Sequence, residues 1–148
     1  MASSDTTQLR LVRGIAQSRE RKLASEVGDL MRQRASAIET VQRLQSYLHE
    51  YQSVEVARGA RSVMEVENER RFVKRLNLAL TQQSTQAQRL DDSASAKTLQ
   101  WQREHANLQA LDRLLMQRAH TESRRQDRNE QKESDARSAR AINEGVPR

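Results

Sequence analysis

One series of positions constrains this chain more than any other feature. From Val73 to Leu115, steps of three and four residues alternate without a slip, and most of the positions reached are apolar. This spacing places the side chains on one face of an α-helix, in the a and d positions of a heptad repeat. The positions are Val73, Leu76, Leu80, Gln83, Ala87, Leu90, Ala94, Lys97, Trp101, Glu104, Leu108, Leu111 and Leu115. Such a seam is typical of a coiled coil.

A second seam with the same alternation lies in the first half of the chain. Seven of its nine positions are aliphatic or Ala, Tyr51 is amphipathic, and Arg34 is the exception. The positions are Leu23, Val27, Leu30, Arg34, Ala37, Val41, Leu44, Leu48 and Tyr51. The pattern breaks at Gly59, and no Gly or Pro follows before Gly145. Two amphipathic helices joined by a short connection usually pair antiparallel. We therefore predict an all-α fold, a long antiparallel two-helix coiled coil whose second helix is the longer.

The seams and the helix-terminal signals also predict where the helices begin and end. The expected segments of this single domain are a first helix at about 5–52, a turn at about 53–61, a second helix at about 62–141 and a frayed tail at 142–148. Residues 3–5 are competent N-caps for the first helix, and Ser62 with Glu65 has the spacing of a capping box. A pivot at about residue 57 would place residue i opposite about residue 114 − i. Roughly 30 residues of the second helix would then have no partner within the chain.

The composition agrees with long helices and excludes several other classes. Charged residues make up 31% of the chain and aromatic residues 3%, with a single Pro. There is no Cys for a disulfide, no run of about 18 apolar residues, and no secretory signal, so we expect a soluble cytoplasmic protein. The net charge of +6 is spread evenly, because residues 1–60, 61–110 and 111–148 each carry +2. An even distribution argues against a basic arm for nucleic acid, a function that the net charge alone would suggest.

No pattern in the sequence indicates catalysis, a metal site or a cofactor. The three His residues, His49, His105 and His120, include no pair at i, i+4, and no Gly-rich phosphate loop or nucleophile elbow occurs. We interpret Asp91-Asp92 as charges on the flank of a helix. The basic cluster of Arg70, Arg71, Lys74 and Arg75 reads as a flank patch facing nearby Glu residues, with a phosphate site as the alternative. We therefore expect a protein that is not an enzyme and holds no cofactor.

Two features indicate contacts with other proteins. Phe72 immediately precedes the seam residue Val73, so we expect it at the edge of the helix pair or outside it. Packing on its own hairpin and contact with a partner are both open interpretations. The second feature is the segment from Gln117 to Asp135, in which Ala119 is the only apolar residue. A helix that is polar all round bridges solvent, binds a partner or frays.

Four stretches together resemble a known family. The segment Leu44–Tyr51 is similar to the Leu-x-x-Tyr-x-x-Glu-Tyr segment that closes the first helix of the FliJ family, the flagellar type III export proteins. The stretch Arg71–Leu80 resembles the start of that family's second helix. Leu108–Arg118, followed by Glu122–Asp127, resembles its Leu-rich and then Arg/Glu-rich C-terminal part, and Gln131–Asp135 fits its ending. The resemblance covers most of the chain.

The resemblance implies a role in flagellar protein export. FliJ-family proteins are antiparallel coiled coils similar to the central stalk of rotary ATPases. Such a stalk would insert into the hexameric export ATPase (FliI), reach the export gate protein (FlhA), and act in a chaperone-like way together with export chaperones. It would be cytoplasmic and held at the cytoplasmic membrane through these partners. The alternatives are the equivalent stalk of a virulence type III secretion system and a structural coiled-coil scaffold.

The resemblance also implies which residues make these contacts. The residues implied in the gate contact are Phe72, Leu76, Ala79 and Gln83, although Gln83 also fits the seam of the hairpin. The ATPase-facing tip would comprise the paired termini and the unpartnered end of the second helix, with Arg118, Arg124, Arg125 and Arg128. Arg outnumbers Lys 22 to 4 in this chain, and Arg side chains bind carboxylates through two parallel hydrogen bonds.

Overall fold

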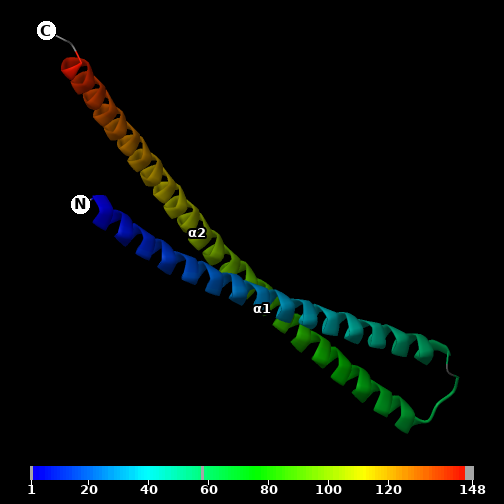
Figure 1. Cartoon of the computed structure of the whole chain (residues 1–148). Coiled ribbons are helices and arrows are strands. Elements are labelled where there is room, and N and C mark those ends of the chain that lie inside the picture. The colour runs from blue at the N-terminus through cyan, green and yellow to red at the C-terminus, as the bar shows by residue number, and fades with distance from the viewer. Residues whose placement is uncertain (1, 58, 146–148) are drawn as a thin grey trace. The chain divides into compact units, whose positions relative to one another are not determined.

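The structure, a computed structural model, describes residues 2–57 and 59–145. These residues form two helices and no strand: α1 (Ala2–Ala57) and α2 (Val63–Glu144), labelled in Figure 1. The predicted all-α fold with a longer second helix is confirmed. Both helices contribute to two compact units. We call Arg21–Arg103 the turn unit, and residues 1–20 with 104–148 the terminal unit.

Helix α1 extends beyond the predicted bounds at both of its ends. It begins at Ala2, so residues 3–5 lie within its first turn and are not the N-caps that the sequence suggested. It continues to Ala57 and does not end near residue 52, because no Gly or Pro interrupts the helix after the seam stops. Arg61 donates from Nη2 to the Glu55 carbonyl oxygen at 2.7 Å. That carbonyl lies in the last turn of α1, where no helical amide is available to it.

Helix α2 begins with the capping box that the sequence predicted. The backbone amide of Glu65 donates to Ser62 Oγ, and the amide of Ser62 donates to Glu65 Oε2, both at 3.3 Å. These reciprocal bonds satisfy amides that have no partner in the first helical turn. No described glycine has a positive φ, so the turn does not use Gly59 in a left-handed conformation. The remaining turn residue, Arg58, lies outside the described residues.

The C-terminal end of α2 differs from the frayed tail that we predicted at 142–148. The helix continues through residues 142–144, which we expected to be frayed, and ends at Glu144. No breaker occurs before Gly145, whose amide donates to the Ala141 carbonyl at 3.0 Å. Residues 146–148 of the predicted tail lie outside the described residues.

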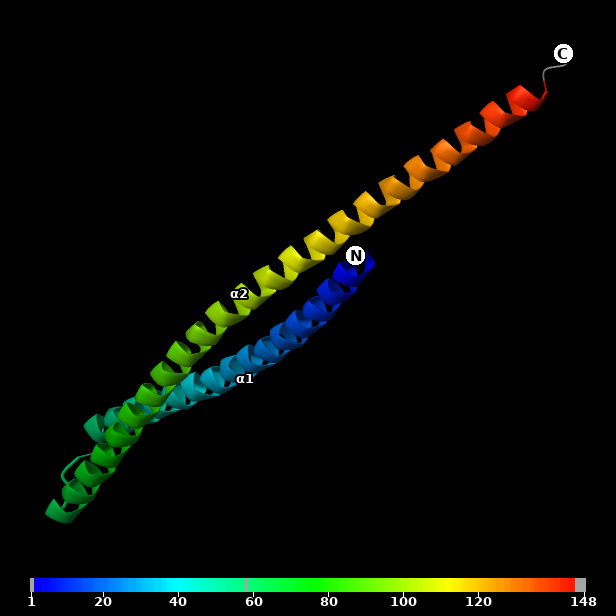
Figure 2. The same cartoon turned by 90° about the vertical axis from the view of Figure 1, so that its left-hand side faces the viewer.

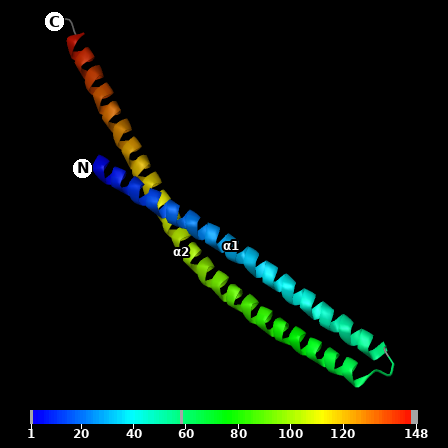
Figure 3. The same cartoon turned by 90° about the horizontal axis from the view of Figure 1, so that it is seen from below.

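Within the turn unit, α1 and α2 run antiparallel on either side of the turn, as Figure 3 shows. Every seam position of both helices in this unit is buried or half-buried, but only Ala37 and Ala94 are fully buried. Two pairs of charges cross between the helices: Arg34 Nε lies 2.8 Å from Asp91 Oδ1, and Lys97 Nζ donates to Glu26 Oε2 at 2.8 Å. Arg34, the exception in the apolar seam, is therefore accommodated by a carboxylate on the other helix.

The terminal unit repeats this arrangement and then leaves α2 alone. Ala16 and Leu108 are its buried residues, and Arg13 Nε lies 2.7 Å from Asp112 Oδ1. Leu115 is the last half-buried residue of α2, and every side chain from 116 to 145 is exposed. Figure 2 shows the last part of α2, in orange and red, extending beyond the N-terminal end of α1.

The charge pairs correct the register that we inferred from the sequence. In the pairs Arg13–Asp112 and Arg34–Asp91, residue i faces about residue 124 − i and not 114 − i. The point at which the chain folds back lies later in the sequence than predicted, because α1 runs five residues further, to Ala57. In the terminal unit, the start of α1 therefore falls opposite about residue 122, and the unpartnered part of α2 is about 20 residues long and not 30.

The Glu26–Lys97 pair predicts how stability depends on pH. The hydrogen bond from Lys97, followed by its charge, lowers the pKa of Glu26 below the ordinary value of 4.5. A carboxyl group with a lowered pKa stabilises the fold above the unfolded pKa, and this contribution is lost as pH falls through the folded pKa. We expect Glu26→Gln to lower the melting temperature at pH 7 and to have a smaller effect near pH 3. The effect should be small, because the pair is open to solvent.

Circular dichroism melts at the two pH values measure this difference. Glu67→Gln serves as the control, because Glu67 is an exposed carboxylate on α2. A Glu26→Gln effect that is as large at pH 3 as at pH 7 would contradict the assignment of this pair.

Candidate functional site

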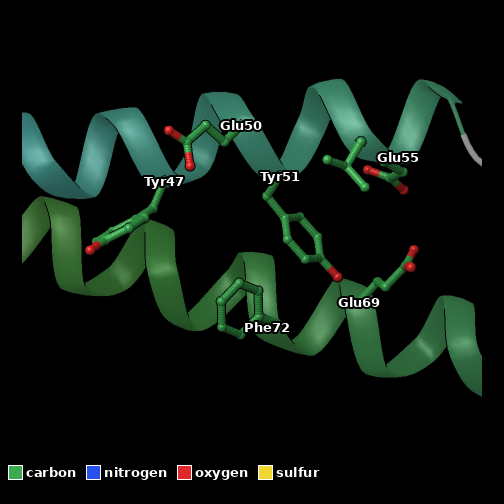
Figure 4. Close-up of a pocket in the computed structure, with 7 residues that line it drawn as sticks. Tyr47, Glu50, Tyr51, Glu55, Glu69 and Phe72 are labelled. Atoms are coloured by element: carbon green, nitrogen blue, oxygen red, sulfur yellow. The ribbon is translucent and has the colours of Figure 1, made fainter.

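One hollow on the described surface lies in the turn unit, between the two helices and close to the turn. It is an open notch of about 310 Å³. Three side chains from α1 and one from α2 form its apolar part, with carboxylates around them, as Figure 4 shows. The apolar residues are Tyr47, Tyr51, Val54 and Phe72, and the acidic ones are Glu50, Glu55 and Glu69. We call this surface the aromatic notch.

The contact between Tyr51 and Phe72 joins the two helices at the notch. Their ring centroids lie 5.0 Å apart with an interplanar angle of 46°. Phe72 is nevertheless 48% exposed, and Tyr47 is 59% exposed. Phe72 therefore has one side against α1 and another open to solvent. This agrees with the expected place of Phe72 at the edge of the helix pair, and it shows that the ring packs in part on its own hairpin. A tilted aromatic pair contributes about 0.5–1.5 kcal/mol beyond its buried area.

Arg61 bonds two of the residues that line the notch. Its Nη1 donates to Glu69 Oε2 in a half-buried ion pair, and its Nη2 bonds the Glu55 carbonyl oxygen. Glu50 and Glu55 are exposed. The notch can therefore hold an apolar side chain, with carboxylates nearby for a cation.

The residues implied in the gate contact lie on one stripe of α2, but they differ in exposure. Phe72 opens into the notch, whereas Leu76, Ala79 and Gln83 are half-buried. Leu76 and Gln83 are also seam positions, so part of each side chain is occupied within the hairpin. Phe72 is therefore the member of this stripe with the most surface free for a partner.

Sequence reasoning missed the contribution of α1 to this surface. We placed Tyr51 in the seam, Tyr47 lies one step off it in the sequence, and neither was connected to Phe72. The assumed pivot placed residue 42 opposite Phe72, whereas the structure places Tyr51 there. The opposite charges of Arg34 and Asp91 could have indicated the register, because placing these two residues opposite each other gives the observed register of the helices.

The remaining charged groups behave largely as flank charges. Asp91 pairs with Arg34, and Asp92 accepts a hydrogen bond from Gln88 Nε2 at 3.1 Å. His105 Nδ1 lies 3.4 Å from Glu20 Oε1. In the basic cluster, Arg70, Arg71, Lys74 and Arg75 are exposed. Within the described ranges, no three His, Cys, Asp or Glu residues gather as a metal site would require, and neither helix could span a membrane.

The four arginines of the implied ATPase-facing tip lie in the terminal unit. Arg118, Arg124, Arg125 and Arg128 are all exposed and follow Leu115, and the last three lie beyond the part of α2 that faces α1. They share no hollow with the aromatic notch, which belongs to the turn unit. The structure thus describes two separate candidate surfaces on the chain.

The Tyr51–Phe72 contact predicts a measurable contribution of Phe72 to stability. We expect Phe72→Ala to lower the free energy of unfolding by about 0.5–1.5 kcal/mol, from the loss of the ring contact. Leu78→Ala is the matched control on the same helix, because Leu78 is 59% exposed. It should cost less than about 0.5 kcal/mol. Chemical denaturation of both variants tests this, and equal effects would show that the ring contact contributes nothing.

Two long helices that pair antiparallel within each unit, over an interface of small apolar residues and ion pairs, define a coiled-coil protein. The sequence profile of the flagellar FliJ protein matches residues 5–145, so the chain belongs to the FliJ family. This confirms the resemblance drawn from the sequence, and it makes the chain a non-enzymatic component of flagellar type III protein export. No curated protein and no solved structure matches it.

Proposed function

We propose that this protein is the stalk of the flagellar export machinery, linking the hexameric export ATPase to the export gate protein. One observation carries the proposal. Helix α2 continues to Glu144 with every side chain from 116 to 145 exposed, well beyond its last half-buried residue, Leu115. A long helix that is polar on all sides fits a segment that another protein surrounds.

The terminal unit is the end that we assign to the ATPase. Its unpartnered helix carries Arg118, Arg124, Arg125 and Arg128, all exposed. Guanidinium groups pair readily with carboxylates on a protein surface. The family match favours the flagellar ATPase as this partner over the ATPase of a virulence secretion system.

The turn unit is the end that we assign to the export gate. Phe72, with Leu76, Ala79 and Gln83 behind it on the same stripe, would provide the contact. An exposed aromatic side chain on an otherwise polar surface is a common anchor for a partner protein. Through these two contacts the protein would be cytoplasmic, held at the cytoplasmic membrane, and available for a chaperone-like role with export chaperones.

ATP hydrolysis by the purified export ATPase tests the assignment of the terminal unit. We expect the full chain to raise the hydrolysis rate in a saturable way. A structural scaffold without a link to the ATPase predicts an unchanged rate at every concentration of the chain.

Capture of the export gate protein tests the assignment of the turn unit. Phe72→Ala should retain less gate protein than the unmodified chain, whereas Leu78→Ala should retain the same amount. Equal retention by both variants would remove Phe72 from the contact. Circular dichroism of each variant establishes that the helices are intact.

A further inference from the structure

The charges on α2 beyond Leu115, its last half-buried residue, are sorted onto two faces. At 100° per residue, five basic side chains between 118 and 132 fall within about 120° of the helix circumference. They are Arg118, Arg124, Arg125, Arg128 and Lys132, and we call them the basic face. Four acidic side chains fall within about 140° on the other side. They are Glu122, Asp127, Glu130 and Glu133. Neutral His120, Asn129 and Gln131 lie between the two faces.

This sorting was hidden in the sequence, where basic and acidic residues alternate. Only the continuous helix to Glu144 separates them, because residues three and four apart share a face. The segment has almost no net charge but a strong difference in charge across its axis. Asp135 is the first residue that departs from the sorting, at the end of the basic face.

The acidic side is the side that continues the seam. Leu111 and Leu115, the last seam residues, project in nearly the same direction as Glu122 and Glu133. Arg124 and Arg128 point more than about 120° away from that direction. Within the terminal unit Arg124 and Arg128 are therefore turned away from the line along which α1 packs, whereas Arg118 and Arg125 lie within about 60° of it.

The side chains of the basic face are also not held in ion pairs within the described part of the chain. All five side chains are exposed, and no ion pair in the described part of the molecule engages any of them. By contrast, Arg137 on the other side of the helix lies 3.8 Å from Glu133. Five cations along about four turns of one helix face are thus available to a partner.

The charges on the two faces favour some kinds of partner over others. Four of the five cations are Arg, which binds carboxylates through two parallel hydrogen bonds. A nucleic acid would be attracted to the basic face but repelled by the carboxylates that share the same thin helix. A second copy of this chain could match the faces only through exposed charges, because the segment from 117 to 135 has Ala119 as its only apolar residue. Ion pairs between two such thin helices would stay exposed to solvent and stabilise weakly, whereas the surface of a folded partner can shield them from water and salt.

We infer that the basic face is a one-sided docking surface for a carboxylate-bearing surface of the export ATPase. The inference rests on the proposed function, since that function supplies the ATPase as the partner. It adds that the contact is electrostatic, that it uses one side of α2 only, and that the acidic side faces away from the partner's carboxylates.

Two double variants of the full chain test this inference. Arg124→Gln with Arg128→Gln removes two cations from the basic face. Arg137→Gln with Arg140→Gln removes the same two charges from the other side of the same helix. Both doubles have the same net charge, and Gln preserves helix propensity. Binding to the purified export ATPase is measured at about 50 and 200 mM salt, because salt screens exposed charges.

We expect the first double to bind about tenfold more weakly than the unmodified chain at the lower salt concentration, with a smaller difference at the higher one. The second double should bind within about twofold of the unmodified chain. If both doubles weaken binding equally, net charge and not the basic face controls the contact. The proposed function would then stand and this inference would not. If the unmodified chain does not bind the ATPase, the proposed function fails and the inference fails with it.

Two further measurements exclude the other partners. Binding of a duplex DNA of about 30 base pairs that falls with the first double, while ATPase binding is unchanged, would assign the basic face to nucleic acid. Sedimentation of the chain alone would assign it to a second copy if the first double converted a dimer to a monomer. Either result overturns the inference.

Discussion

Leu80→Ala is expected to lower the free energy of unfolding by about 2–3 kcal/mol, and Leu44→Ala by a similar amount. Both leucines are seam residues of the turn unit and are half-buried, so the expected loss lies at the lower end of the range for buried leucines. The interface has little else to compensate, because its fully buried residues in this unit are Ala37 and Ala94. Chemical denaturation followed by circular dichroism gives the measurement.

Arg43→Ala is the matched control for Leu44→Ala. Arg43 is adjacent in sequence but exposed, and its Nη2 bonds Glu39 Oε1 on the same helix at 2.5 Å. An exposed pair of this spacing contributes about 0.3–0.5 kcal/mol. Equal losses for the two substitutions would contradict the placement of Leu44 in the seam.

The second large effect is expected from removing the unpartnered part of α2. A chain that ends after Arg118 retains Leu108 and Leu115, the last buried and half-buried residues of the helix. Its melting temperature should therefore be nearly unchanged. It lacks Arg124, Arg125 and Arg128, so we expect it to lose most of its stimulation of the export ATPase while it still binds the gate protein.

ATP hydrolysis and gate capture, measured on the same truncated protein, separate the two assignments. Full stimulation by the truncated chain would show that the ATPase contact lies elsewhere. Loss of gate capture together with stimulation would mean that the two candidate surfaces do not act separately.

The helical fold and the residues between the helices were predictable, whereas the register was not. A residue such as Leu44 or Leu90 is placed at the interface by spacing alone, because a 3.5-residue period keeps one face toward the partner. The same period repeats every seven residues and is compatible with several registers. The register depends on where the turn falls, and Ala57 as the end of α1 was hidden because the seam stops at Tyr51 while the helix continues.

Because the register was unknown, the sequence could predict only part of the aromatic notch. Phe72 was recognised as unusual from its place beside the seam. Its contact with Tyr51 depends on a residue in the other helix, which only the correct register identifies. The sorting of charges on α2 was missed for a related reason. The alternation of Arg and Glu in sequence conceals their separation until the helix is known to be continuous from Val63 to Glu144.

The ion pairs of the terminal unit have a mechanical consequence. Arg13–Asp112 and Glu20–His105 are spaced by seven residues on both helices. If one helix slid along the other by one heptad, the apolar spacing would still match, but Arg13 would meet His105, or Glu20 would meet Asp112. Sliding in one direction juxtaposes two bases and in the other two acids. These contacts therefore oppose a slide of one heptad that the apolar residues alone would permit.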